Sequence, residues 1–206
     1  MVEDKWANPQ KMWDERFSQP EAVYGHAPNS FLVEQTTRFR QGMRLLVPGD
    51  GYGRNGIWLA QQGFQVHTVD LSAVGVARAQ AAAQAAGVAL KIEQADLAIW
   101  NWPVDHFDGV IAIFLHLPPQ VRPNVHKSML RAVKPAGLIL LQAFSPAQLK
   151  YSSGGPKQVD LLYSADILRQ DFAPAQPLEL QEKEVQIDEG YMHRGRASVV
   201  QVVFQK

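Results

Sequence analysis

From residue 43 onward, short runs of apolar residues alternate with segments in which apolar residues recur at helical spacing. Continuous apolar runs are typical of strands buried on both faces, and the intervening segments are long enough for crossover helices. This alternation predicts a mostly parallel, doubly wound sheet with helices on both faces. The expected strands are 43–47, 65–70, 90–95, 108–114 and 138–144, and the expected helices are 55–62, 73–86, 118–133 and 164–172.

Glycine, serine and proline residues mark the expected ends of these helices. Gly63 and Gly87 follow the first and second helices, at a position where a left-handed backbone costs glycine little. Ser72 is placed to cap the second helix. Pro118 is expected as the first residue of the third helix, with Pro123 in or near its first turn.

The last third of the chain departs from this alternation. Segment 150–160 is typical of an irregular loop, and segments 177–188 and 197–206 are both strand-like with no helix between them. Two strands in direct succession predict an antiparallel strand at one edge of the sheet. The fold class expected is therefore α/β, with about seven strands that are mostly parallel and a last strand that is antiparallel.

The residues before position 43 predict a helical cover for this core. Segments 10–17 and 30–39 are expected to be helices on either side of a loop over 18–29. The expected organisation is a single domain over 1–206, with an N-terminal helical lid over 1–42 and a core over 43–206.

Composition narrows the classes of partner. Twenty basic residues balance twenty acidic ones among 206, so no long-range field attracts nucleic acid or an anionic membrane. No apolar run reaches the roughly 20 residues that span a bilayer. The absence of cysteine excludes a disulfide, a thiolate metal site and a cysteine nucleophile, and the six histidines lack zinc-site spacing. We expect a cytoplasmic monomer or homodimer that binds a small molecule and no metal.

The sequence PGDGYGRNG, between the first expected strand and helix, contains two overlapping glycine signatures. Read from Gly49 it is G-x-G-x-G, and read from Gly51 it is G-x-G-x-x-G, the dinucleotide fingerprint. Such glycines let the backbone approach a ligand, and Asp70 ends the next strand, where a carboxylate can accept from both ribose hydroxyls. Both registers predict an adenosine-type ligand; the alternative is a tight turn beside an exposed acid.

Two features favour the G-x-G-x-G register. In the dinucleotide fingerprint the first glycine closely follows the strand. Here the strand runs into Pro48 and Gly49, so it ends two residues earlier than a fingerprint that begins at Gly51 requires. Asp96 and Leu97 follow the third strand, beside the expected position of an adenine. There a carboxylate can accept from an exocyclic amine, and the Leu97 N–H can donate to a ring nitrogen.

Taken together, GRNGIWLAQQGFQVHTVDLS, ADL, FDGVIAIFLHLP and VKPAGLILLQAF resemble the class I S-adenosylmethionine-dependent methyltransferases. The likeness is to the branch with tellurite-resistance (TehB-type) and thiopurine-type enzymes, and it extends from about Trp13 to the last strand. It implies a Rossmann-like fold, S-adenosylmethionine as cofactor and S-adenosylhomocysteine as product.

The resemblance also implies roles for individual residues. The glycines of the loop would pack against the methionine portion of the cofactor, Asp70 would bind the ribose, and Phe114 would lie near the amino-acid portion. One position departs from the family, because Val47 replaces the usual acidic residue two positions before the first glycine. Asp50 can supply a carboxylate instead. The implied cofactor-binding residues are Gly49, Asp50, Gly51, Gly53, Asn55, Asp70, Leu71, Asp96, Leu97 and Phe114.

A sulfonium methyl group is already activated, so its transfer needs mainly alignment and exclusion of water. An acceptor hydroxyl or amine must also lose a proton, and His116 after the fourth strand is the candidate base. The alternative is that His116 caps a helix or packs in the core. His26 and His193 lie in loops that can face the same cleft.

The N-terminal and fifth-strand loops supply candidates for the lid and the acceptor site. Trp13, Arg16 and Tyr24 can cover the cofactor, since aromatic rings exclude water and an Arg fork matches a carboxylate; ordinary helix packing is the alternative. After the fifth strand, a Gly154–Gly155 hinge flanked by Tyr151 and Lys157 can bind the acceptor, or can be a surface loop.

Three functions remain to be distinguished. The first is methyl transfer to a small acceptor, such as a thiol-like compound or a metalloid oxyanion, a choice that rests on family analogy. The second is an NAD-type oxidoreductase that uses Gly51 to Gly56. The third is a cofactor-binding protein without transfer activity, which the Val47 departure and the uncertain base suggest.

Overall fold

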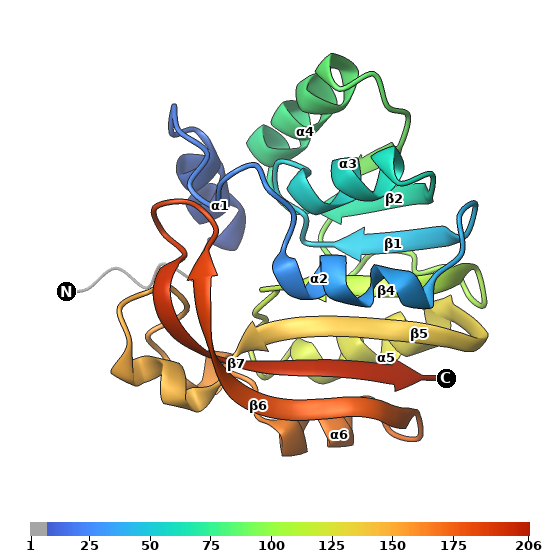
Figure 1. The fold of residues 1–206 in the computed structure, drawn as a ribbon, viewed down its shortest axis with the longest axis vertical. Helices are drawn as coiled ribbons and strands as arrows, with labels where there is room; N and C mark the ends of the chain where they lie inside the picture. Colours follow the sequence, from blue (N-terminus) through green and yellow to red (C-terminus); the bar gives the residue numbers. More distant parts are fainter. Residues whose placement is uncertain (1–7) are drawn as a thin grey trace.

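The computed structural model describes residues 8–206, which form a seven-stranded sheet in the order β3-β2-β1-β4-β5-β7-β6 with helices around it (Figure 1). The expected α/β fold of about seven strands is confirmed. The strands are β1 (Arg44–Pro48), β2 (Gln65–Asp70), β3 (Lys91–Gln94), β4 (Phe107–Ile113), β5 (Val133–Phe144), β6 (Gln176–Asp188) and β7 (Arg194–Gln205). The helices are α1 (Pro9–Phe17), α2 (Ser30–Gln35), α3 (Arg54–Gln61), α4 (Ala73–Ala85), α5 (Arg122–Ala132) and α6 (Ala165–Asp171), with short 3-10 turns at Thr36–Arg38, Pro146–Lys150 and Val159–Leu161.

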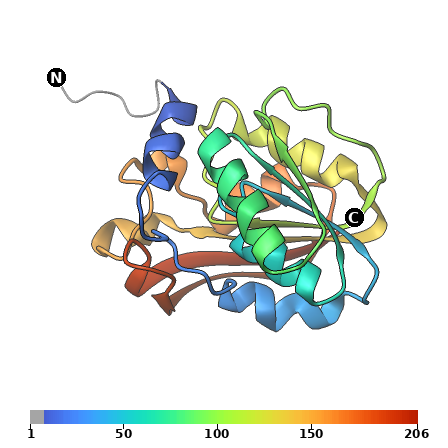
Figure 2. The ribbon, with the colours of Figure 1, turned by 90° about the horizontal axis from the view of Figure 1, so that it is seen from above.

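The first five strands are parallel, and β7 runs antiparallel to both β5 and β6. The helices α2 and α3 cover one face of the sheet, and α5 and α6 cover the other (Figure 2). Leu45 and Val47 of β1 point into the first core layer, whereas Leu46 between them points into the second. Both faces of β1 are therefore buried, as its continuous apolar run predicts.

Two element boundaries differ from the sequence expectation. Helix α5 begins at Arg122 instead of Pro118, because Pro118 precedes another proline, which disfavours the helical backbone at that position. The Pro118 carbonyl accepts from the N–H groups of Val121 and Arg122 and closes a turn. Pro123 does lie in the first turn of α5. Strand β5 begins at Val133, before the expected 138, and a register irregularity against β4 accompanies this early start.

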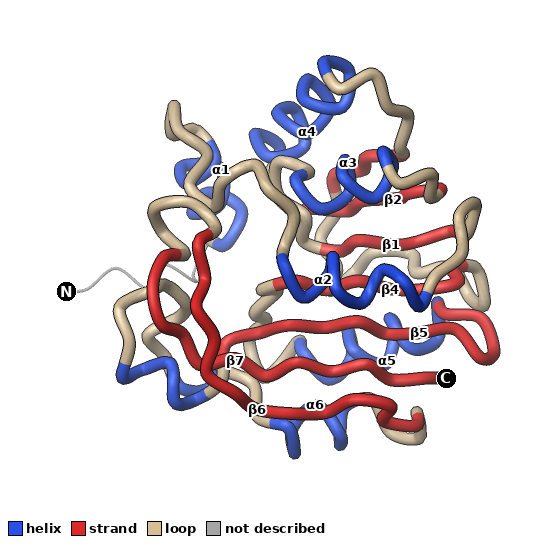
Figure 3. The backbone as a smooth tube through the Cα atoms, in the orientation of Figure 1, coloured by secondary structure: helices blue, strands red, loops and turns tan. Residues whose placement is uncertain are grey.

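The hairpin of β6 and β7 extends beyond the end of the strand beside it. Strand β5 ends at Phe144, which pairs with Val199, but β6 and β7 continue to the pair Asp188 and Arg194. The extra length projects beyond the carboxyl end of β5 and carries residues 189–193, the hairpin tip. Figures 1 and 3 show this tip on the same side as α1, where the strands β1 and β4 also end.

No helix within residues 8–206 combines the length and the apolar character needed to cross a membrane. Residues 1–7 of the predicted lid lie outside the described part of the chain. The division into a lid over 1–42 and a core over 43–206 stays a prediction.

Candidate active site

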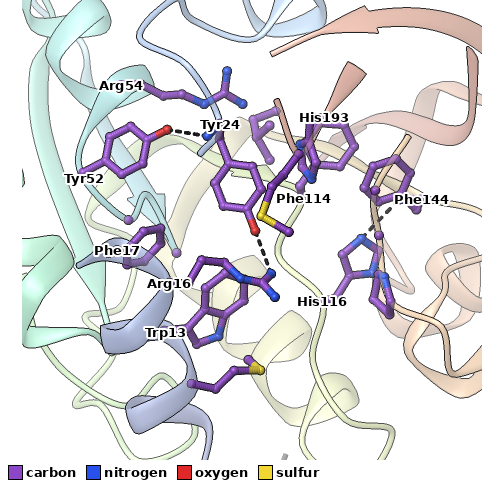
Figure 4. A pocket seen from close by; sticks show the side chains of 18 of the residues that line it. Trp13, Arg16, Phe17, Tyr24, Tyr52, Arg54, Phe114, His116, Phe144 and His193 are labelled. Atoms are coloured by element: carbon purple, nitrogen blue, oxygen red, sulfur yellow. Dashed lines mark hydrogen bonds between the residues drawn. The ribbon is translucent and has the colours of Figure 1, made fainter. Parts of the chain in front are cut away.

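A cavity of about 760 Å³ lies at the carboxyl ends of β1, β4 and β5. One side is the glycine loop between β1 and α3, and the opposite side comes from the loop after β5 and the hairpin tip. Helix α1, with Trp13 and Arg16, and the loop after it, with Tyr24, form a further side (Figure 4). Of the predicted cofactor-binding and acceptor residues, the cavity is lined by Gly49, Asp50, Gly51, Asn55, Phe114, Trp13, Arg16, Tyr24, His116 and Lys157.

The glycine loop has the backbone that its sequence predicts. Gly49, Gly51 and Gly53 have φ values of 70°, 58° and 90°, in the left-handed region that favours glycine. A Cβ atom on Gly51 would lie 2.7 Å from the ring of Phe17. The loop therefore offers bare backbone to the cavity, and larger side chains are excluded by contact as well as by conformation.

Asp50 is a buried carboxylate in the wall of this cavity. Its Oδ2 accepts from the Gly56 N–H at 2.9 Å, whereas Oδ1 is buried without a hydrogen-bond partner among residues 8–206. Burial raises the pKa of Asp50 to about 7, against the opposing effects of the Gly56 N–H and the Arg54 charge. A cation in the cavity would satisfy Oδ1 and stabilise the ionised form.

Asp70 organises the same loop from the end of β2. Its Oδ2 accepts from the Gly51 N–H at 2.7 Å and its Oδ1 accepts from the Ser72 N–H at 2.8 Å. Burial raises the pKa of Asp70, while these two N–H groups oppose the increase. Asp70 does not line the cavity, because the N-terminal helix covers this part of the loop.

Helix α1 is held over that region by polar contacts. Asp14 accepts from Ser72 Oγ at 2.5 Å and from the Val74 N–H at 3.2 Å, at the start of α4. Arg78 donates to the Phe17 carbonyl at 2.6 Å. The Phe17 ring lies where Cβ atoms on Gly51 or Gly75 would fall, at 2.7 and 2.9 Å. Neither Asp14 nor Phe17 was predicted to belong to the site.

The residues predicted to hold an adenine are not part of the cavity. Asp96 is exposed, and its Oδ1 accepts from the Ala98 N–H at 2.9 Å. Leu97 is buried in the core, and its carbonyl accepts from Trp102 Nε1. Leu71 is half-buried, and its carbonyl accepts from Gln94. These residues follow β2 and β3, and none of them lines the cavity.

The predicted lid residues come together above the glycine loop. Arg16 Nη1 donates to the Tyr24 hydroxyl at 2.8 Å, and the guanidinium lies 5.2 Å from the centre of the Trp13 ring (Figure 4). The Tyr52 hydroxyl accepts from the Tyr24 N–H and donates to the Gly25 carbonyl. Arg16 forms no ion pair within the described residues, so its charge is available to an anion in the cavity.

His116 lines the cavity but has no ring nitrogen free for the predicted role of base. Its Nδ1 donates to the Leu161 carbonyl at 2.7 Å, and its Nε2 accepts from the Phe144 N–H at 3.2 Å. Burial lowers the pKa of His116 to about 4. The ring is a neutral link between β5 and the loop before α6, which corresponds to the packing alternative.

His193, at the hairpin tip, occupies the cavity instead. Its side chain is buried, and Nδ1 has no hydrogen-bond partner within residues 8–206. Burial lowers the pKa of His193 to about 3, and the positive charges of Arg54 and Arg16 contribute. Segments 177–188 and 197–206 are longer than 138–144, and that difference was the sequence signal that the tip projects over the site.

A buried polar network holds the hairpin tip against the glycine loop. Glu189 pairs with Arg54 of α3 and accepts from Asn29 Nδ2 at 2.6 Å. The Asn29 N–H donates to Asn55 Oδ1 at 3.0 Å, which connects the lid loop to α3. The hairpin tip and the loop over 18–29 are thereby joined to the start of α3, which follows the glycine loop.

The loop after β5 forms the remaining wall. A Cβ on Gly154 would lie 2.6 Å from the His193 ring, and one on Gly155 would lie 2.8 Å from the Phe144 ring, so both glycines allow close packing. Lys157 is exposed at the rim of the cavity. Tyr151 is not part of the wall, since its hydroxyl bonds to Glu184 on β6. The prediction of Tyr151 at the acceptor site is therefore not supported.

Phe114 stands out by its backbone. It follows β4 with a φ of 52°, which is unfavourable for a large side chain. Its ring stacks on Phe144 with centroids 4.5 Å apart, and His193 meets it edge-on at 4.7 Å. Strained residues of this kind cluster at functional sites, and Phe114 contributes its ring directly to the cavity wall.

The comparisons with known proteins agree with this geometry. Residues 46–137, from β1 to β5, match the family model of a methyltransferase domain. That match shows a methyltransferase domain over these residues. It agrees with the sequence resemblance to the class I methyltransferases. No curated protein sequence matches the chain significantly.

Solved structures of the same fold are similar over nearly the whole chain. One, from work on the conversion of a disulfide bond into a thioacetal group during echinomycin biosynthesis, is 21% identical with a TM-score of 0.77, covering 96% of this chain and 92% of that one. TehB from Haemophilus influenzae is 16% identical, with a TM-score of 0.71 and coverage of 96% and 66%. The cyclase SpnF is 18% identical, with a TM-score of 0.72 and coverage of 96% and 94%. At these identities the likeness concerns the fold.

Proposed function

We propose that this chain transfers a methyl group from S-adenosylmethionine to a small-molecule acceptor in the cavity. The observation that carries this proposal is the pairing of opposite charges across one site. Asp50 presents an unpartnered carboxylate oxygen, and Arg16 presents a guanidinium without an ion-pair partner in residues 8–206. The amino-acid end of the cofactor carries an ammonium and a carboxylate, which match these two groups.

In this proposal Asp50 supplies the carboxylate that is missing at position 47, where Val47 stands in place of an acidic residue. Val47 is fully packed in the core, whereas Asp50 lies three positions later and faces the cavity. The bare backbone of Gly49 and Gly51 allows a ligand to approach the loop closely. In this proposal the carboxylate has moved from the end of β1 into the glycine loop.

The adenosine half is assigned to Asp70, with Asp96 and Leu97 beside the adenine. Because Asp14 and Phe17 cover the segment that contains Asp70, access of a ribose to this carboxylate requires α1 to shift. Helix α1, which also carries Arg16, is held by the polar contacts of Asp14 and Arg78 and by the buried ring of Phe17. Movement of one helix would therefore open the ribose site and close the carboxylate site together.

When bound, the cofactor supplies a methyl carbon that forms a bond to an acceptor lone pair while its bond to sulfur breaks and the electrons return to sulfur. The protein's part is to align the two molecules and to exclude water. The aromatic rings of Trp13, Tyr24 and Phe114 line the cavity and serve the second purpose. No metal is assigned a part, and residues 8–206 contain no group of three metal-ligating side chains.

Calorimetric titration tests this proposal. S-adenosylhomocysteine and NAD are titrated separately into the protein and into Asp50→Asn, Arg16→Gln and Asp70→Ala variants. We expect the homocysteine compound to bind, and each variant to weaken it by about tenfold or more, as for the loss of a charged hydrogen bond. Exposed Asp166→Asn is the control, because its pair with Arg169 lies on α6. Binding of NAD alone would contradict the assignment.

A further inference from the structure

His193 has a buried ring nitrogen that the protein leaves without a partner. The side chain is 6% exposed, and Nδ1 has no hydrogen bond within residues 8–206. Buried polar atoms are usually bonded, and leaving one unbonded costs about 1–3 kcal/mol. Nε2 has no hydrogen-bond partner within these residues either, and because His193 lines the cavity, a ligand there is placed to bond to the imidazole.

The position of His193 is fixed from several directions. Its backbone N–H donates to the Gly190 carbonyl, and its carbonyl accepts from the Glu189 N–H within the tight hairpin tip. Glu189 is in turn held by Arg54 and Asn29. A side chain supported in this way cannot turn easily to find another partner. Nδ1 therefore stays without a hydrogen bond in the folded, ligand-free protein.

Aromatic rings surround this nitrogen. The His193 ring lies 4.4 Å from Tyr24, 4.7 Å from Phe114 and 5.2 Å from Phe144, measured between ring centres. The Gly154 backbone lies against the other side of the imidazole. Flat apolar walls of this kind favour a flat apolar ligand, because aromatic rings pack well edge-on and face-on.

The charged groups of the cavity are assigned to the cofactor, bonded within the protein or exposed at the rim. In the function proposed above, Asp50 and Arg16 bind the two charges of the cofactor. His116 has both nitrogens bonded within the protein, and Lys157 stands at the exposed rim. Beside His193, the cavity therefore offers the imidazole and the Tyr24 hydroxyl as hydrogen-bonding groups among aromatic rings.

We propose that His193 binds the methyl acceptor through its imidazole, and that the acceptor is a small aromatic molecule with a hydrogen-bonding group on its ring. The inference rests on the proposed function for the identity of the site, but the binding itself is measurable without methyl transfer. It assigns acceptor recognition to the hairpin tip, and it gives His193 a role in specificity.

Phenol and toluene are the probes, since they share size and shape and differ in the hydroxyl group. Their dissociation constants are measured by NMR titration, with the free protein and with the S-adenosylhomocysteine complex. We expect phenol to bind about tenfold more tightly than toluene, the equivalent of one hydrogen bond. In His193→Phe the two probes should bind equally, and in the control His106→Phe, an exposed histidine, the difference should remain.

A second measurement needs no variant. The ¹⁵N resonances of the His193 imidazole should shift when phenol is added and should stay nearly unchanged with toluene. Equal binding of the probes to the wild-type protein, binding of neither, or a difference that survives in His193→Phe would each overturn the inference. If S-adenosylhomocysteine fails to bind while phenol is still preferred, the proposed function is wrong and the role of His193 stands.

Discussion

Glu189 at the hairpin tip forms a buried ion pair with Arg54 at the start of α3, and both side chains are only 7% exposed. The pair joins a strand connection near the end of the chain to the helix that follows the glycine loop. Through it, the wall that carries His193 is fixed relative to the loop that carries Asp50. The geometry of the cavity therefore depends on a contact between residues that lie far apart in the sequence.

Glu189→Ala is expected to lower the free energy of unfolding by about 3–5 kcal/mol, because it leaves the buried Arg54 charge unpaired. Glu184→Ala is the matched control on the same hairpin, since its pair with Arg196 is largely exposed. That variant should cost about 1 kcal/mol or less. Urea unfolding followed by circular dichroism measures both, and equal costs would argue against a structural role for the buried pair.

Cofactor affinity should depend on pH through Asp50. Burial raises its pKa to about 7, so the free protein loses the negative charge as the pH falls through this value. The ammonium of S-adenosylhomocysteine requires the ionised form, and its affinity should fall by up to about tenfold per pH unit below pH 7. Calorimetry between about pH 5.5 and 8.5 tests this. In Asp50→Asn the affinity should be low and nearly flat with pH; a steep fall in that variant would assign the titration to another group.

The same group should make Asp50→Asn more stable than the wild type at high pH. A carboxyl group with a raised pKa stabilises the folded state below its unfolded value of 3.8, and that contribution is lost as the pH rises to about 7. Asparagine carries no such titration. Thermal unfolding of the ligand-free proteins should show the gain of the variant growing between about pH 4 and pH 7 and levelling off above that. A gain that is constant with pH would not agree with burial of an ionised Asp50.

At Phe114 the glycine variant should be more stable than the alanine variant, the reverse of the usual order. Because its φ is 52°, Phe114→Gly relieves backbone strain that Phe114→Ala keeps, and the glycine variant should be more stable by about 1 kcal/mol. Phe144, an ordinary residue of β5, is the comparison, and there alanine should be better by roughly 0.5–1 kcal/mol. Chemical denaturation of the four variants decides, and the same order at both positions would contradict strain at Phe114.

Much of the fold was predictable because strand and helix periodicity is local. Buried parallel strands need apolar residues on both faces, so β1 and β4 could be located from short runs, and glycine marked the tight turn between β1 and α3. The start of α5 was placed too early because Pro118 fits a helix start on its own, whereas its neighbour Pro119 excludes it.

Individual side chains were harder to assign. His116 follows β4 and His193 precedes β7, both at the edge of the sheet where the cavity lies. The sequence favoured His116 as the candidate, although of the two the structure leaves only His193 free to bind a ligand. The difference depends on the Leu161 carbonyl and the Phe144 N–H, which bond both nitrogens of His116. Those partners come from other parts of the chain, and residue type alone does not specify them.

The sequence by itself determined the class of fold, the glycine loop and the carboxylates that end or follow its strands, because these follow from periodicity and from the conformational freedom of glycine. Only the tertiary structure decided which groups share the cavity. Asp50 and His193 are brought together there by the Glu189–Arg54 pair and by the extension of β6 and β7 beyond the end of β5. Such proximity arises from contacts between distant segments, and no local pattern records it.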